Sequence, residues 1–227
     1  MQRKKNILVT QRSERIADRN ESRDSLDQGF AKLFSPYFNL ILVPSKIHCP
    51  EEFAKDMNCK GIILSGGNTI YEDNSSNSPQ RLKTEISLLN YAKLKKLPVF
   101  GICYGMHVLN HYFGGSVIKS INNHTNVIHH VNFLGKTLST NSYHNFSIYD
   151  HSLSKKFKVF AEAEDGTIEG FIHNQLPWIG VMWHPERDLA FNKNFVDAII
   201  KIFKYYRLEN NSSYIYDVLH EFINKAN

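Results

Sequence analysis

Hydrophobic residues gather in short continuous runs along the first half of the chain, and amphipathic stretches separate these runs. A strand buried on both faces of a sheet has such a run, whereas a strand with one face in solvent alternates apolar and polar residues. Buried strands that alternate with helices predict a parallel sheet covered on both faces. The predicted strands are 5–10, 40–44, 61–65 and 98–102, the predicted helices are 21–34, 81–95 and 106–113, and residues 71–80 form a predicted polar loop.

After Gly115 the pattern changes to shorter and more polar strands. A continuous apolar run then returns, and two amphipathic helices follow it. No internal repeat or long linker interrupts the pattern, so we expect a single α/β domain over residues 1–227. In this half the predicted strands are 126–134, 145–149, 158–163, 168–173 and 178–183, and the predicted helices are 195–206 and 214–223.

Composition and cysteine content narrow the class of protein. Of the 227 residues, 42% are hydrophobic, which is enough for a sizeable core. Cys49, Cys59 and Cys103 are an odd and sparse set that argues against a disulfide framework. The basic start MQRKKNILVT has an apolar run too short for a signal peptide, and no stretch reaches membrane-spanning length. We therefore expect a soluble cytoplasmic protein without a membrane partner.

The net charge of +5 raises the question of a nucleic-acid partner. The lysines are dispersed among acidic residues, and the sequence has no dense Arg/Lys stripe, RNA-binding signature or zinc-ligand spacing. We expect no nucleic-acid partner, no metal and no cofactor. A basic surface can still favour an anionic small-molecule substrate.

The stretch GICYG, residues 101–105, places a cysteine between two glycines where a predicted strand meets a predicted helix. Such a turn lifts the Cys103 side chain out of the sheet, at the carboxyl ends of the strands where ligands bind. The helix N-terminus favours the thiolate, and Gly101 and Gly105 leave room for a close backbone crossing. The alternative is a buried structural cysteine, so the interpretation depends on a nearby base.

The candidate base is His184 in WHPERD, residues 183–188. It follows an apolar run and therefore lies at the carboxyl end of a predicted strand, level with Cys103. Glu186 follows across Pro185, which stiffens the backbone and allows the carboxylate to be held against the imidazole. The three residue types match a nucleophile, a base and an orienting group. Taken alone, His184 and Glu186 are equally well explained as a strand cap and a solvated acid.

Attack on an amide carbonyl also needs hydrogen-bond donors for the oxyanion that forms. The backbone N–H of Tyr104, just past Cys103, is one candidate. Gly67 in LSGGN, residues 64–68, follows a buried strand and offers a second donor. The alternative for this glycine pair is a simple tight turn.

LSGG, PVFGICYGMHVLN and VMWHPE, in this order, resemble the class I glutamine amidotransferase superfamily over nearly the whole chain. The resemblance implies a flavodoxin-like fold, a γ-glutamyl thioester on Cys103, and a triad of Cys103, His184 and Glu186. NSYHNFSI, AEAEDGTIEGFIHNQLPWIGVMWHPE and RDSLDQGF are similar to the branch of γ-glutamyl-γ-aminobutyrate hydrolases. That branch consists of free-standing hydrolases of γ-glutamyl amides.

The resemblance also suggests which residues bind the substrate. Residues around Ser142, Tyr143 and His144 would border the glutamyl pocket through backbone contacts, and Gly66 would border it beside the oxyanion donors. Most of the superfamily has glutamine four residues after the nucleophile, where this chain has His107. This histidine either replaces an amide hydrogen bond, indicates a changed substrate, or is a neutral residue at the edge of the pocket.

Within that branch the chain resembles the hydrolases that act on γ-glutamyl-CDP-amidate in capsule biosynthesis, which implies a nucleotide-linked leaving group. The candidates for phosphate contacts are Arg23, His107 and Arg187, with Arg23 ranked above Arg187. Other possible substrates are γ-glutamyl polyamine catabolites and folate polyglutamates. The alternative functions are a glutaminase subunit that supplies ammonia to a separate synthase and an inactive binding module. Nothing in the sequence indicates an oligomeric state.

Overall fold

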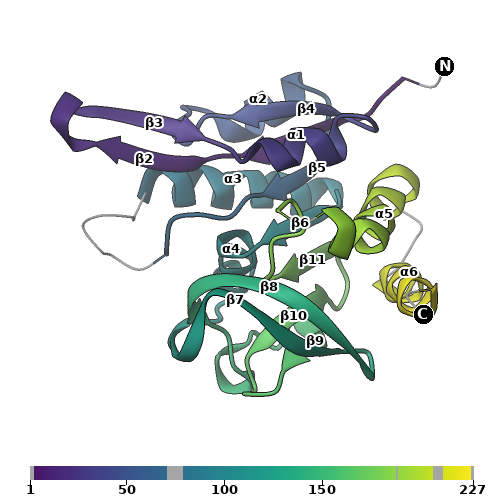
Figure 1. Ribbon diagram of the computed structural model, residues 1–227. Coiled ribbons are helices and arrows are strands. Elements are labelled where there is room, and N and C mark those ends of the chain that lie inside the picture. Colours follow the sequence, from purple (N-terminus) through teal and green to yellow (C-terminus); the bar gives the residue numbers. More distant parts are fainter. Residues whose placement is uncertain (1–2, 71–78, 188, 207–211, 226–227) are drawn as a thin grey trace.

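The computed structural model describes residues 3–70, 79–187, 189–206 and 212–225, and within them nine strands form one sheet (Figure 1). Five parallel strands make up one part of this sheet and four antiparallel strands the other. In spatial order the strands are β4 (Asn39–Val43), β1 (Asn6–Thr10), β5 (Cys59–Leu64), β6 (Val99–Ile102), β11 (Trp178–Val181), β10 (Ile168–His173), β9 (Phe157–Ala163), β7 (Ile118–Phe133) and β8 (Lys136–Ser147).

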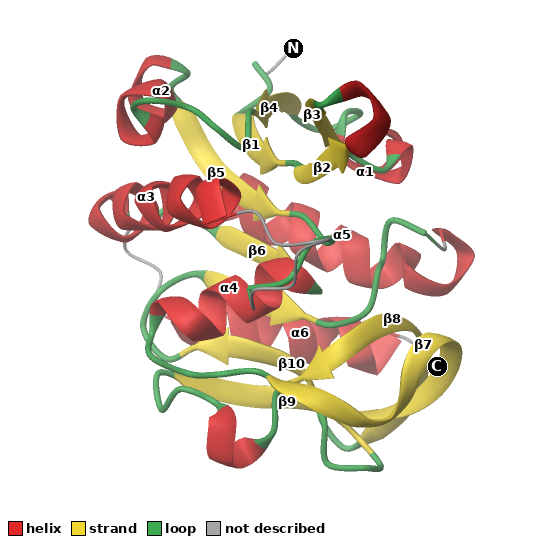
Figure 2. Cartoon of the chain, turned by 90° about the vertical axis from the view of Figure 1, so that its left-hand side faces the viewer, coloured by secondary structure: helices red, strands yellow, loops and turns green. Residues whose placement is uncertain are grey.

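The parallel strands follow the order of a flavodoxin-like sheet. Numbered along the chain, they lie in the order 2-1-3-4-5. Figure 2 shows helices α3 and α4 in front of the sheet, with α5 and α6 behind it. The predicted α/β, mostly parallel fold is confirmed. The helices are α1 (Gln28–Phe34), α2 (Pro50–Asp56), α3 (Pro79–Lys95), α4 (Tyr104–Tyr112), α5 (Leu189–Tyr205) and α6 (Ser212–Lys225).

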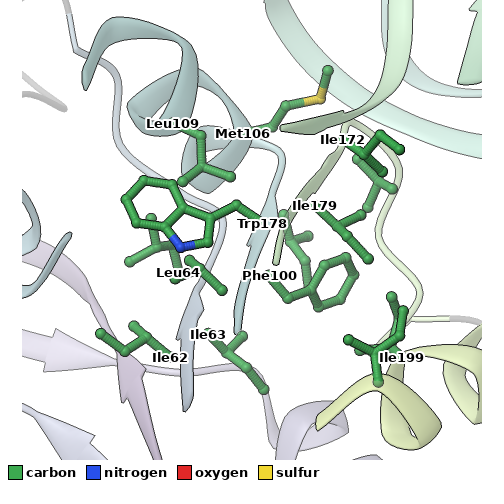
Figure 3. Close-up of a cluster of buried hydrophobic side chains, with 14 of the residues drawn as sticks. Ile62, Ile63, Leu64, Phe100, Met106, Leu109, Ile172, Trp178, Ile179 and Ile199 are labelled. Atoms are coloured by element: carbon green, nitrogen blue, oxygen red, sulfur yellow. The ribbon is translucent and has the colours of Figure 1, made fainter. Parts of the chain in front are cut away.

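The buried core joins the strands that later carry the candidate site. Figure 3 shows Trp178 of β11 among aliphatic side chains of β5 and α4, with Phe100 of β6 beside Ile179. Trp178 is fully buried, and its indole N–H donates to the Leu97 carbonyl oxygen at 3.2 Å, so the buried polar atom has a partner. This packing fixes β6 and β11 at the centre of the molecule.

The helix predicted over residues 21–34 is wrong in its first part. Residues 21–25 form strand β3 (Glu21–Ser25), which pairs with β2 (Arg12–Ile16) in a two-stranded hairpin apart from the main sheet. The helix begins only at Gln28, after Asp27 caps it by accepting a hydrogen bond from the Gly29 N–H at 2.8 Å. The hairpin residues are mostly exposed and polar, so they lack the apolar alternation from which a strand is predicted.

Other boundaries also differ from the prediction. Strands 126–134 and 145–149 are parts of one long hairpin, β7–β8, and the polar strand β8 was not predicted along most of its length. The short helix α2 was missed as well. Of the predicted 71–80 loop, residues 71–78 lie outside the described residues, and 79–80 belong to α3. None of the helices in the described ranges combines the length and apolarity needed to span a membrane.

Candidate active site

Strand β6 and helix α4 place Cys103 at a sharp turn. Its backbone has φ 52° and ψ −106°, a conformation that residues with a side chain seldom adopt. The turn can approach β5 because its neighbours are glycines. A Cβ on Gly105 would lie 2.2 Å from the Leu64 carbonyl oxygen, and one on Gly101 would lie 2.6 Å from the Gly105 carbonyl oxygen. The elbow predicted from GICYG is therefore present.

His184 reaches Cys103 from the neighbouring strand β11. Ile102 lies opposite Val181 in the parallel pair, and the Cys103 N–H donates to the Val181 carbonyl oxygen at 2.8 Å. Asn141 of β8 then fixes the His184 backbone from both sides. Its side chain accepts a hydrogen bond from the His184 N–H at 2.8 Å and donates one to the His184 carbonyl oxygen at 3.0 Å. The sequence analysis missed this positioning role of Asn141.

Glu186 orients the imidazole of His184. Its Oε1 accepts a hydrogen bond from His184 Nδ1 at 2.6 Å, and both side chains are almost fully buried. With Nδ1 held in this way, the other edge of the ring is available to the Cys103 thiol, which lies close enough to raise the pKa of His184. The structure thus brings together the three side chains predicted as nucleophile, base and orienting carboxylate.

The electrostatics of this trio favour a thiolate–imidazolium pair. Burial alone would raise the pKa of the Cys103 thiol, but the charge and hydrogen bond of His184, with the Tyr104 N–H, lower that pKa below its ordinary value. Burial opposes the charged imidazole as well, yet Cys103 and Glu186 together raise the pKa of His184 to about 9. The site therefore holds an activated sulfur next to a proton donor.

The two predicted oxyanion donors come from the turn after β5 and from the residue after Cys103. The Tyr104 N–H contributes to the low pKa of the Cys103 thiol, so it lies close to the sulfur. The carbonyl oxygens of Gly66 and Gly67 accept hydrogen bonds from Arg81 at 3.0 and 2.8 Å. Because a trans peptide directs its N–H opposite to its C=O, the Gly67 N–H points away from Arg81. This direction is compatible with the role predicted for Gly67.

Arg81 is a positioning residue that the sequence analysis missed. It is fully buried on α3, donates to the Ser65 carbonyl oxygen at 2.7 Å as well as to the two glycine carbonyls, and pairs with Glu85 at 2.9 Å. Its guanidinium also lies 4.2 Å from the centre of the Tyr104 ring. One side chain therefore contacts both segments that carry the predicted oxyanion donors. A buried arginine at the start of a helix has no sequence signal that separates it from a surface arginine.

The segment 142–144 lies on β8 beside the trio, with alternating side-chain directions. Ser142 is buried and donates from Oγ to the His124 carbonyl oxygen at 2.6 Å. Tyr143 faces outward, with its ring centre 5.6 Å from that of His184. His144 is buried, and its charge contributes to the low pKa of Cys103. The substrate contacts predicted for this segment through its backbone stay a prediction.

His107 lies one helical turn past Cys103 and is buried. Burial, together with the charge of His144, lowers the pKa of His107 to about 3, although a hydrogen bond to the Phe146 backbone opposes the shift. The imidazole is therefore neutral near neutral pH, so it can offer hydrogen bonds but no positive charge to a phosphate.

A cleft opens beside His184 toward the β2–β3 hairpin. Arg187 lines it and lies 4.3 Å above the Tyr143 ring centre, and Arg12, which the sequence analysis did not single out, lines it from the hairpin. Arg23 is not among the lining residues, and its guanidinium pairs with Glu21 on the exposed hairpin. The described lining residues are Arg12, Glu14, Ser25, Leu26, Asp27, Phe30, Ser65, Gly66, Gly67, His184, Glu186 and Arg187.

Comparisons with known proteins identify the relatives of this chain. The chain is 33% identical over 190 residues to a gamma-glutamyl-CDP-amidate hydrolase of Campylobacter jejuni, covering 82% of this chain and 92% of that protein. It is also 33% identical over 159 residues to a glutamine-hydrolyzing GMP synthase of Dictyostelium discoideum, where the match covers 63% of this chain and 21% of the synthase.

The fold and the family model lead to the same assignment. A crystal structure of a glutamine amidotransferase from Thermotoga maritima superposes with a TM-score of 0.62, at 15% identity, over 98% of each chain, which shows the fold. The model for "Glutamine amidotransferase class-I" matches residues 24–198, a range that contains the elbow, the Gly66–Gly67 turn, His184 and Glu186. The chain therefore belongs to the class-I glutamine amidotransferase family.

Proposed function

We propose that the chain is a free-standing hydrolase of a γ-glutamyl amide and that Cys103, His184 and Glu186 are its catalytic triad. The observation that carries this proposal is the buried contact of His184 with both Cys103 and Glu186. The Cys103 thiolate attacks the amide carbonyl carbon, and the N–H groups of Tyr104 and Gly67 stabilise the oxyanion.

Collapse of the tetrahedral intermediate breaks the C–N bond. His184 gives its proton to the departing nitrogen, which leaves a γ-glutamyl thioester on Cys103. The neutral His184 then takes a proton from water, the hydroxide attacks the thioester carbonyl, and glutamate leaves with regeneration of the thiolate–imidazolium pair. Glu186 keeps the imidazole oriented and stabilises its charged form through both steps.

For the leaving group we propose a nucleotide-linked amidate, as in γ-glutamyl-CDP-amidate, with a role in capsule biosynthesis. The name of the Campylobacter jejuni relative supports this choice. Arg12 and Arg187 line the cleft beside His184, where they lie 3.2 Å from Glu14 and 3.9 Å from Asp27, and we propose that their guanidinium groups bind the phosphates. We place the reaction in the cytoplasm, because a catalytic thiol is kept reduced there.

Glutamate release by the purified chain tests the proposal. The substrates are γ-glutamyl-CDP-amidate, γ-glutamyl-γ-aminobutyrate and glutamine. We expect kcat/KM to be highest for the nucleotide-linked amide and to fall with salt for that substrate alone, because charge pairs with phosphate are screened. Arg187→Ala should remove most of the preference. Arg23→Ala is the matched control, since its side chain pairs with Glu21 outside the cleft.

Three results would contradict the proposal. Equal kcat/KM for all three amides, with no salt effect, would remove the nucleotide-linked leaving group. A loss of preference in Arg23→Ala but not in Arg187→Ala would place the phosphate contact on the hairpin instead. Activity on glutamine alone that depends on a copurifying synthase would identify an ammonia-supplying subunit.

A further inference from the structure

Three strands of the antiparallel part of the sheet bring three imidazoles around one buried carboxylate. His124 and His129 come from β7, His144 from β8 and Glu169 from β10. His124, His144 and Glu169 are at most 4% exposed, and their nearest donor atoms all lie within 4.8 Å of one another. The His129 side chain is 16% exposed, so the cluster reaches solvent at that corner. We name these four residues the histidine cluster.

A bulge in β7 turns both of its histidines to the same side. Residues five apart on a regular strand point to opposite faces. The pairing of β7 with β8 shifts between Thr125 and Val127, and Asn126 between them has φ 57°. Because of this extra residue, the side chains of His124 and His129 point to the same face of the strand, and their ring centres lie 5.0 Å apart.

Four polar atoms of the histidine cluster are buried without a hydrogen-bond partner among the described residues. They are His124 Nδ1, His129 Nε2, His144 Nε2 and Glu169 Oε2. Buried polar atoms in native proteins are almost always satisfied, and each exception needs a physical explanation. His129 Nε2 and His144 Nε2 face the Glu169 carboxylate at 3.6 and 3.5 Å, which is too long for hydrogen bonds, so the cluster leaves these atoms available to a bound species that accepts electron pairs.

Hydrogen bonds to neighbouring groups determine which ring nitrogen of His124 and of His144 is available to bind an ion. His124 Nε2 lies 2.8 Å from Asp165 Oδ2, and His144 Nδ1 lies 2.9 Å from the Phe146 carbonyl oxygen. Each of these nitrogens therefore carries a proton, and a metal ion would displace any proton on the opposite nitrogen, whose lone pair then faces the cluster. A carboxylate or backbone carbonyl behind a histidine is the usual outer support of a metal ligand.

The distances between the imidazole nitrogens and the Glu169 carboxylate are longer in the histidine cluster than in a hydrogen-bonded histidine–carboxylate pair. The two closest histidine–carboxylate hydrogen bonds in the described residues measure 2.6 Å at His184 and 2.8 Å at His124. By contrast, Glu169 lies 3.5 Å from His144 Nε2 and 3.6 Å from His129 Nε2. Two ligands of a tetrahedral ion with bonds of about 2.0–2.1 Å are about 3.4 Å apart. These two Glu169 separations fit donor atoms that face a shared ion, and the His124 donor atom lies within 4.8 Å of those of His144 and Glu169.

The geometry points to a divalent metal site, with His124 Nδ1, His144 Nε2 and Glu169 as ligands and His129 Nε2 at the fourth position. Two or three imidazoles with one carboxylate form a borderline donor set that suits zinc better than magnesium or calcium. The ion would tie the β7–β8 hairpin to β10 directly behind His144. It would thereby keep a positive charge near Cys103 without occupying the substrate cleft.

Zinc binding to the metal-stripped full-length chain tests this inference. A Cys103→Ser background prevents binding by the nucleophile, so the outcome is independent of the hydrolase proposal. We expect one equivalent of zinc by calorimetry, no response to magnesium, and a Tm raised by about 5–10 °C at zinc concentrations a hundredfold above Kd. Cobalt in the same site should give a tetrahedral d–d spectrum without a thiolate charge-transfer band.

Variants locate the ion in the histidine cluster. Glu169→Gln and His124→Ala should weaken zinc binding at least a hundredfold, and Asp165→Asn, behind His124, should weaken it about 10- to 100-fold. His130→Ala is the matched control, because this exposed β7 histidine bonds Ser139 outside the cluster. A chain that binds less than a tenth of an equivalent with unchanged Tm would overturn the inference. So would zinc binding that Glu169→Gln and His124→Ala leave intact.

Discussion

Replacing Gly66 by alanine tests how tightly the candidate base is held. A Cβ at this position would lie 2.6 Å from His184 Cε1. Ordinary contact needs about 3.6 Å, so the imidazole must move by about 1 Å. The ring has little freedom to move, because Glu186 holds its Nδ1 at 2.6 Å and Asn141 holds its backbone. A misplacement of about 1 Å costs about 100-fold in rate, or about 2.7 kcal/mol of activation free energy.

A second glycine separates this effect from simple overpacking. A Cβ on Gly61, earlier on β5, would lie 2.7 Å from the buried Phe203 ring of α5, in the hydrophobic core. Both alanine variants should lose about 1–3 kcal/mol of stability in thermal unfolding. Only Gly66→Ala should lose kcat about 100-fold in glutamate release from a γ-glutamyl amide. If its kcat stayed within threefold of that of Gly61→Ala, the reasoning about His184 would be refuted.

The other predictions concern the nucleophile, the base and the oxyanion loop. Cys103→Ala should lower kcat by several orders of magnitude, whereas Cys49→Ala should leave kcat unchanged. His184→Ala should lose nearly as much as Cys103→Ala, but Glu186→Gln should lose less, because Glu186 orients the imidazole without transferring the proton; equal losses would contradict this division. Iodoacetamide should alkylate Cys103 at lower pH than Cys49, because His184 lowers the pKa of Cys103, and His184→Ala should shift the profile to higher pH. Arg81→Lys keeps the charge but cannot donate to three carbonyl oxygens at once, so kcat should fall at least tenfold with KM nearly constant. An unchanged kcat would show that the turn at residues 65–67 keeps its conformation without Arg81.

The sequence predicted those parts of the fold in which local pattern and burial agree. Buried runs such as 61–64 and 99–102 read as strands because both of their faces are covered. The β2–β3 hairpin and β8 were missed because their residues are polar and partly exposed, and only pairing with another strand makes them extended. The predicted helix began too early because its apolar positions, Leu26, Phe30 and Leu33, do not extend into residues 21–25, which pair across the hairpin instead.

The residues of the candidate site also fall into those that a local sequence pattern predicted and those that it missed. Cys103, His184 and Glu186 were found because a turn between two glycines and a short fixed spacing leave a local signature. Arg81 and Asn141 act on segments distant in sequence, so no local pattern marks them. The histidine cluster draws on residues from three strands without metal-ligand spacing, which is why the sequence led us to expect no metal.

Cys103 and His184 follow the ends of neighbouring strands, β6 and β11, but are 81 residues apart in the chain. At a synthesis rate of 5–20 residues per second, the ribosome reaches His184 about 4–16 s after Cys103. Until β11 has joined β6, neither the imidazole nor the Val181 carbonyl is in place, and the sulfur is an ordinary, mostly protonated thiol. Nascent and misfolded chains therefore carry no activated nucleophile, and the reactive thiolate arises only in a chain that has completed its fold.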